Sequence, residues 1–173
     1  MPMPRAFSSR TRISLGSLLF LSVAAVAGPG AAQSQSVLTY HYDYLRTGWN
    51  SNETILTPAT VPSLQLLTSV SLDEQVDAQP LLVPGLTIAG GTHDLLYVAT
   101  EGNTLYALDA ATGAILLTRN FGTPVPESAL PGQCNNNSGV VGINSTPVID
   151  PASSTMYVMV YTYDNNDCRA VLR

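Results

Sequence analysis

The sequence predicts an all-β fold made of repeated antiparallel strands. Residues 95–121 read as short strand-forming runs separated by tight turns, and two segments of the chain resemble each other. No convincing amphipathic helix follows residue 32. The chain is 45% apolar and 11% charged, which is enough for a compact core and argues against disorder.

The first hairpin is predicted by its turn. Leu95–Thr100 and Thr104–Leu108 are two strand-forming runs on either side of Glu101, Gly102 and Asn103. Gly and Asn tolerate positive φ angles, which tight hairpin turns require. We therefore expect two antiparallel strands, with Gly102 as a structural residue of the turn.

A second turn brings in a third strand. Asp109 to Gly113 forms the turn, and Ala114–Asn120 runs back along the sheet. We expect Asp109 to accept backbone N–H bonds inside the loop and Gly113 to adopt the left-handed conformation. An isolated meander of this kind cannot bury both faces, so a similar unit must lie beside it.

An internal repeat supplies that second unit. Gln79–Val83 matches Thr146–Asp150, and Leu95–Thr100 matches Thr155–Val160. Pro80 and Pro147 lie near the beginning of the first strand of each copy, where a missing N–H does least harm. Repeats of this length are typical of propeller blades or other arrays.

The predicted organisation follows from the repeats. Residues 33–63 form an N-terminal arm or loop, and residues 64–173 form a partial β-propeller of antiparallel four-stranded blades, with repeats at about 79–121 and 144–173. Leu64–Leu72 alternates as a leading strand. Because a propeller closes with about four to eight blades, we expect about two blades of an incomplete ring. The remaining blades then lie in a missing part of the protein or come from self-assembly.

Residues 1–32 are predicted to be a signal peptide. Arg5, Arg10 and Arg12 precede the apolar run Ile13–Ala27 and the small residues of 28–32, which is the layout of a secretory leader. The apolar run is short for a membrane span. Cleavage after Ala27 or after Ala32 fits, and a secreted or periplasmic protein is expected.

Charge excludes some partners. After residue 32 the chain holds four arginines against twelve acidic residues and no lysine, a net charge of about −8. Such a surface repels nucleic-acid phosphates and anionic lipid heads. We therefore expect no nucleic-acid partner and no membrane contact after cleavage.

The two cysteines of the chain are predicted to form a disulfide. Cys134 and Cys168 both lie in polar segments, and an even count in an oxidising compartment favours a disulfide over a metal pair. Asp164–Asp167 offers oxygen ligands but lacks the Gly and Glu of a known calcium loop, so a solvated hairpin turn is expected. His41 and His93 are isolated in the sequence and are expected to be surface or packing residues.

The aromatic segment Tyr40–Asn50 has two interpretations. An aromatic patch with an arginine can be a ligand platform, but more often such a segment is an arm packed on the fold.

The chain also resembles a known family. L-Y-A-L-D-A-A-T-G-A-I-L-L, which ends at Leu117, is similar to the repeat of pyrroloquinoline-quinone (PQQ) type β-propellers, although Leu117 stands where that repeat usually has tryptophan. The order of further motifs, including R-T-G at Arg46, N-E-T at Asn52 and S-T-P-V-I-D at Ser145, resembles exported bacterial PQQ-binding-like repeat proteins. The resemblance implies a propeller fold and export. Because only about two blades are present, we expect the chain to be the N-terminal piece of a larger propeller.

The resemblance leaves the activity open. PQQ-dependent dehydrogenases bring an adjacent Cys-Cys pair, a calcium ion held by Glu and Asn, and an Asp base, none of which has a matching motif here. We therefore predict no catalytic or metal-binding residue and assign no cofactor or cofactor-binding residue. We expect a binding or scaffold module whose partner is a protein or carbohydrate. The alternative is the N-terminal part of a PQQ-dependent dehydrogenase, with PQQ and calcium in the complete protein.

Overall fold

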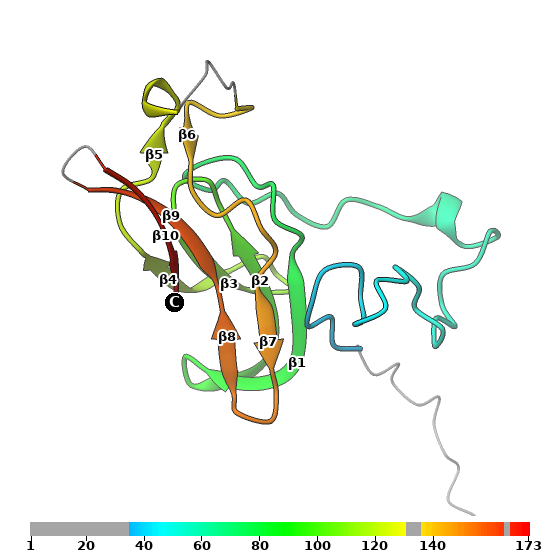
Figure 1. Ribbon diagram of the computed structural model, residues 1–173. Helices are drawn as coiled ribbons and strands as arrows, with labels where there is room; N and C mark the ends of the chain where they lie inside the picture. The colour runs from blue at the N-terminus through cyan, green and yellow to red at the C-terminus, as the bar shows by residue number, and fades with distance from the viewer. Residues whose placement is uncertain (1–34, 131–135, 165–166) are drawn as a thin grey trace, which may run out of the picture. The chain divides into compact units, whose positions relative to one another are not determined.

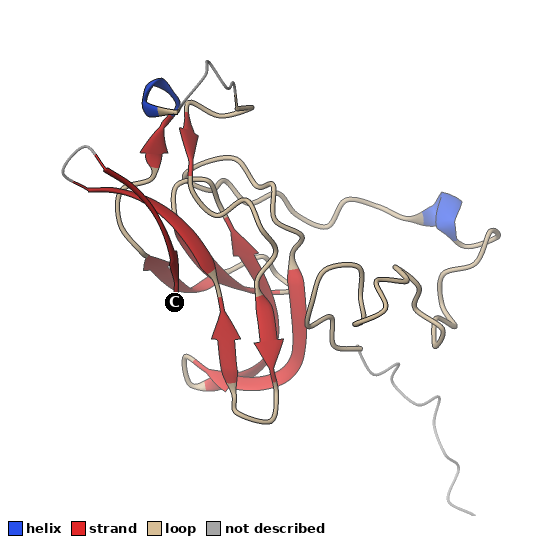
Figure 2. Cartoon of the chain, viewed as in Figure 1, coloured by secondary structure: helices blue, strands red, loops and turns tan. Residues whose placement is uncertain are grey.

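The computed structural model describes residues 35–130, 136–164 and 167–173, which belong to one compact unit, Gln33–Arg173. The predicted signal peptide at residues 1–32 lies outside the described residues. The all-β prediction is confirmed: antiparallel strands dominate the described residues, and the helices there are single 3₁₀ turns, η1 (Val61–Ser63) and η2 (Glu127–Ala129) (Figure 2). The closed propeller stays a prediction.

A four-stranded antiparallel sheet is the largest element. Its order is β1-β2-β3-β4, with β1 at Leu81–Ile88, β2 at Gly91–Ala99, β3 at Thr104–Asp109 and β4 at Ile115–Asn120 (Figure 1). The three runs predicted from residues 95–120 are therefore strands. The strand predicted from Gln79 begins at Leu81 and runs further than expected, to Ile88.

Turn chemistry explains the hairpins. Ala89 and Gly90 between β1 and β2 both have positive φ, 51° and 82°, as a two-residue hairpin turn requires. Between β2 and β3 the left-handed residue is Asn103, with φ 58°. Gly85 lies within β1, where the register with β2 shifts between Val83 and Leu86.

Smaller sheets follow. The paired strands are β5 (Val125–Pro126) with β6 (Val140–Val141), β7 (Val148–Asp150) with β8 (Thr155–Tyr157), and β9 (Met159–Asp164) with β10 (Asp167–Leu172) (Figure 1). The second repeat, predicted at about 144–173, begins its first strand only at Val148. The hairpin predicted around Asp164–Asp167 is present as the β9–β10 pair, and its residues 165–166 lie outside the described residues.

The internal repeat is visible in the strand register. Leu81 pairs with Tyr97 in the β1–β2 hairpin, and Val148 pairs with Tyr157 in the β7–β8 hairpin. These are corresponding positions of the two sequence copies. The two copies therefore form the same antiparallel hairpin in the same register.

The two faces of the large sheet are buried against different partners. Ala99 and Leu105 pack with Val158 and Val160 of the second repeat. The next residues along the same strands, Val98 and Tyr106, face the other way and pack with Val70 and Leu72. A meander buried on both faces is what the sequence required.

The segment 64–72 is a correction to the sequence prediction. It forms no strand: its residues pair with no strand of the described structure, and Leu66 and Leu67 are 83% and 84% exposed. Only its end reaches the sheet, where Val70 and Leu72 pack.

Candidate functional site

A polar cleft of about 410 Å³ lies where the N-terminal arm meets the loop before β7. It is lined by six residues that together provide a guanidinium, a carboxylate, an amide, two hydroxyls and an aromatic ring: Tyr40, Arg46, Asp77, Asn144, Ser145 and Thr146. The wall thus combines donors and acceptors around one aromatic surface.

One wall comes from the aromatic arm, whose loop is closed by its own hydrogen bonds. The Asp43 carboxylate accepts the Thr47 N–H at 3.2 Å and the Thr47 hydroxyl, and the Gly48 N–H donates to the His41 carbonyl at 2.9 Å. The Thr47 hydroxyl is the main reason that the pKa of Asp43 lies below its ordinary value. The His41 N–H donates to Gln79 Oε1 at 3.0 Å, which anchors the loop beside β1.

The arm presents aromatic surface to solvent. The Tyr40 and His41 rings stack with centroids 4.0 Å apart, and the Arg46 guanidinium lies 5.4 Å from the Tyr40 ring centroid. Tyr44 and Trp49 are 84% and 69% exposed. The arm is therefore anchored to the fold as one interpretation expected, and it also keeps the exposed aromatic residues that the platform interpretation needs.

The opposite wall is the loop of residues 142–146, which is held at both ends. At one end the Gly142 N–H donates to Glu101 Oε2 at 2.7 Å. At the other, the Gln79 N–H donates to the Thr146 hydroxyl at 2.9 Å. Because Gln79 also holds His41, one residue positions both walls of the cleft.

Glu101 is the buried support of this loop. Its side chain is fully buried at the tip of the β2–β3 hairpin, and its Oε1 makes no hydrogen bond within the described residues. Burial raises the pKa of Glu101, and the neighbouring Asp77 raises it further, against the lowering effect of the Gly142 N–H. Asp77 therefore connects the buried carboxyl to the open cleft.

Sequence reasoning missed Glu101. It lies in T-E-G-N-T, a turn sequence in which an acidic residue is ordinarily solvated. Its burial depends on Gly142, 41 residues further along the chain, which no local signal could reveal.

Four of the residues predicted from the sequence serve turns and strand starts. Asp109 Oδ1 accepts the N–H groups of Ala111 and Thr112 at 3.1 and 2.7 Å, and Gly113 has φ 75°. Pro80 and Pro147 immediately precede β1 and β7. None of these four lines the cleft.

Gly102 lies in the β2–β3 turn, where an added Cβ would meet Asp73 Oδ2 at 2.6 Å. Asp73 accepts hydrogen bonds from the hydroxyls of Thr100 and Thr104. Although burial acts to raise it, the pKa of Asp73 is lowered by these bonds. Because Gly102 has no side chain, the Asp73 carboxylate has room to accept the two threonine hydroxyls of this turn.

His93 is not isolated as the sequence suggested. Its Nδ1 lies 2.6 Å from Asp109 Oδ2, and this bond, followed by that of the Thr112 hydroxyl, lowers the pKa of Asp109 to about 2. The pair joins β2 to the end of β3. Because Asp109 also accepts the backbone N–H groups of Ala111 and Thr112, the pair holds this turn against β2.

The predicted disulfide is not formed with Cys168, which is free on β10. Its proposed partner, Cys134, lies outside the described residues.

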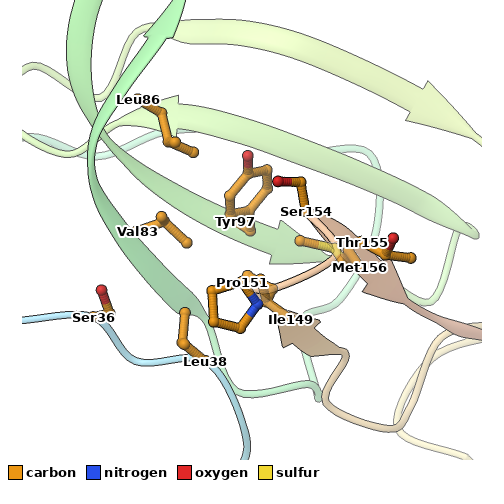
Figure 3. A pocket seen from close by; sticks show the side chains of 10 residues that line it. All are labelled: Ser36, Leu38, Val83, Leu86, Tyr97, Ile149, Pro151, Ser154, Thr155 and Met156. Carbon is orange, nitrogen blue, oxygen red and sulfur yellow. The ribbon is translucent and has the colours of Figure 1, made fainter.

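A second hollow is apolar. It has a volume of about 250 Å³ and lies where β1 and β2 meet β7 and β8. Figure 3 shows its apolar side chains, among them Val83, Tyr97, Ile149 and Met156, with Ser154 at one end. No charged residue lines it.

Within the described ranges, no group of three or more His, Cys, Asp or Glu side chains could hold a metal ion. The helices described there are too short to cross a membrane. No protein-family model matches the chain, and the comparison with curated proteins finds no match either.

Proposed function

We propose that the chain is part of an exported β-propeller-type repeat protein and that its polar cleft binds a carbohydrate. The proposal for the fold is supported by the register of the repeat, because corresponding residues pair in both hairpins. A propeller repeats one antiparallel unit side by side, and the two copies here pack face to face through Ala99, Leu105, Val158 and Val160.

The residues that line the polar cleft support the second half of the proposal, that the cleft binds a carbohydrate. A saccharide presents many neighbouring hydroxyl groups, each both a donor and an acceptor, on an otherwise neutral surface. Arg46 supplies several donors in fixed geometry, Asp77 supplies acceptors, and Asn144 supplies both. The hydroxyls of Ser145 and Thr146 adapt to either role.

The surroundings favour a neutral sugar over other polar ligands. Net charge after residue 32 is about −8, which disfavours phosphorylated or polyanionic ligands. The exposed rings of Tyr44 and Trp49 on the same arm offer apolar faces, on which the C–H surfaces of a sugar ring pack.

A screen of neutral and acidic oligosaccharides tests the proposal, followed by calorimetry of the full chain with the best neutral sugar. Arg46→Gln removes the guanidinium and its N–H donors from the cleft and should weaken binding of the sugar about tenfold or more. Arg119→Gln is the matched control, because Arg119 also lies over an aromatic ring, 5.0 Å from the Phe121 centroid, but outside the cleft. It should bind as the unchanged protein does.

Two results would overturn this function. One is the absence of any saccharide whose binding depends on Arg46. The other is a tight stoichiometric complex with PQQ and Ca²⁺ that oxidises alcohols in a dye-linked assay, which would favour the dehydrogenase alternative.

A further inference from the structure

The apolar pocket is a built feature rather than a loose gap. The segment 36–38 closes one side, since Val37 and Leu82 exchange two backbone hydrogen bonds at 2.8 and 3.0 Å. On the other side the Ile149 N–H donates to the Leu38 carbonyl at 2.9 Å. Three chain segments are thus held around the pocket by backbone bonds.

Two hydroxyls give the pocket a polar end. Tyr97 and Ser154 both line it, and Figure 3 shows both oxygens directed to the same end. Neither hydroxyl makes a hydrogen bond to another described residue. Burial raises the pKa of Tyr97, so its phenol stays protonated and able to donate.

Size and charge limit what the pocket can hold. A cavity of about 150 Å³ accepts benzene, so about 250 Å³ accepts a single ring with a small substituent. The lining has no charged side chain that could pair with an ion. The occupant must therefore be small, mainly apolar and neutral.

We propose that this pocket binds a neutral phenol or aromatic alcohol. The ring packs against Val83, Ile149 and Met156, and the ligand hydroxyl bonds to the hydroxyls of Tyr97 and Ser154. This site is separate from the polar cleft and shares no lining residue with it.

The test is methyl NMR of the full chain with p-cresol as the probe. The methyl signals of Val83, Ile149 and Met156 should shift and saturate at about millimolar probe, as expected for a ligand of this size. Toluene, which lacks the hydroxyl, should bind about threefold to tenfold more weakly, and 4-methylbenzoate should not shift these methyls. No saturable shift with p-cresol overturns the proposal, as does equal binding of the three probes.

Variants locate the site. Tyr97→Phe keeps the ring and should weaken p-cresol binding threefold to tenfold without changing toluene binding. Tyr157→Phe is the matched control, because Tyr157 occupies the corresponding position of the second repeat and does not line the pocket. Equal losses in the two variants, or none in Tyr97→Phe, overturn the assignment.

A variant that covers the opening of the pocket, and a measurement without the probe, distinguish p-cresol binding from occupation by another molecule. Leu86 borders the pocket and is 37% exposed, so Leu86→Trp can cover the opening while the fold is kept, and it should abolish the p-cresol shifts. If pocket methyls shift with protein concentration in the absence of the probe, a second copy of the chain fills the pocket and the proposal fails.

Discussion

Gly142→Ala is expected to destabilise the fold strongly. A Cβ at residue 142 would lie 2.2 Å from the Glu101 carbonyl oxygen and 2.6 Å from Asn103 Oδ1. An ordinary carbon–oxygen contact needs about 1 Å more, and the nearest neighbour is backbone at the hairpin tip, which cannot rotate away. Overpacking of this kind costs about 1–3 kcal/mol.

The same shift would lengthen the bond from the Gly142 N–H to Glu101. A hydrogen bond to a charged group contributes about 1.5–3 kcal/mol, so the total loss for Gly142→Ala is about 2.5–6 kcal/mol. Urea unfolding followed by circular dichroism measures it. With an m-value of about 2 kcal/mol/M, the midpoint should fall by about 2 M.

Gly139→Ala is the matched control. A Cβ at residue 139 has no neighbour within 4 Å, so the free energy of unfolding should stay within about 0.5 kcal/mol of that of the unchanged protein. If Gly142→Ala and Gly139→Ala unfold at the same urea concentration, the close approach of this loop to the hairpin tip is refuted.

Two further predictions concern pH. Burial raises the pKa of Glu101, so the folded chain binds this proton more tightly than the unfolded chain, and stability falls as pH rises from the ordinary value of 4.5 through the folded pKa. Glu101→Gln should flatten that fall in urea midpoints measured between about pH 4.5 and 8, and an unchanged slope would contradict it. His93 and then Thr112 lower the pKa of Asp109 to about 2, so the ionised form stabilises the fold above the ordinary value of 3.8, and this contribution is lost as pH falls through about 2. His93→Gln should move the Asp109 pKa toward 3.8 in a carboxyl NMR titration, and a value that stays near 2 would refute the role of His93.

The hairpins were predictable because their signals are local. Asn103 takes the left-handed conformation that its turn needs, and Asp109 binds the N–H groups two and three residues ahead. These preferences act within a few residues and do not depend on the rest of the chain. The repeat was also predictable, because matched residues in the two copies fix matched strand registers.

Segment 64–72 shows where such reasoning fails. Alternating apolar residues predict a strand only if a sheet edge is available to accept its backbone hydrogen bonds. In the described structure Leu66 and Leu67 pair with no strand and stay exposed. The alternating pattern therefore correctly indicates that Val70 and Leu72 are buried on one side. Its prediction that the segment pairs as a strand is wrong.

The polar cleft was unpredictable for a related reason. Its lining residues lie between positions 40 and 146, and only backbone contacts over long separations bring them together. The bonds from Gln79 to Thr146 and from Gly142 to Glu101 span 67 and 41 residues. A single sequence shows the types of these residues but not their proximity.

These contacts explain why the cleft lies at the junction of the two repeats. The first hairpin ends in the short turn that buries Glu101, and Glu101 holds the loop that leads into β7. The corresponding hairpin of the second repeat, β9–β10, is paired out to Asp164 and Asp167 and so extends further. The two copies share their register but differ at their tips. The short tip of the first leaves room for the loop, and the loop supplies Asn144, Ser145 and Thr146 to the cleft. Binding at the cleft therefore requires both repeats in contact, which ties the proposed function to the repeated fold.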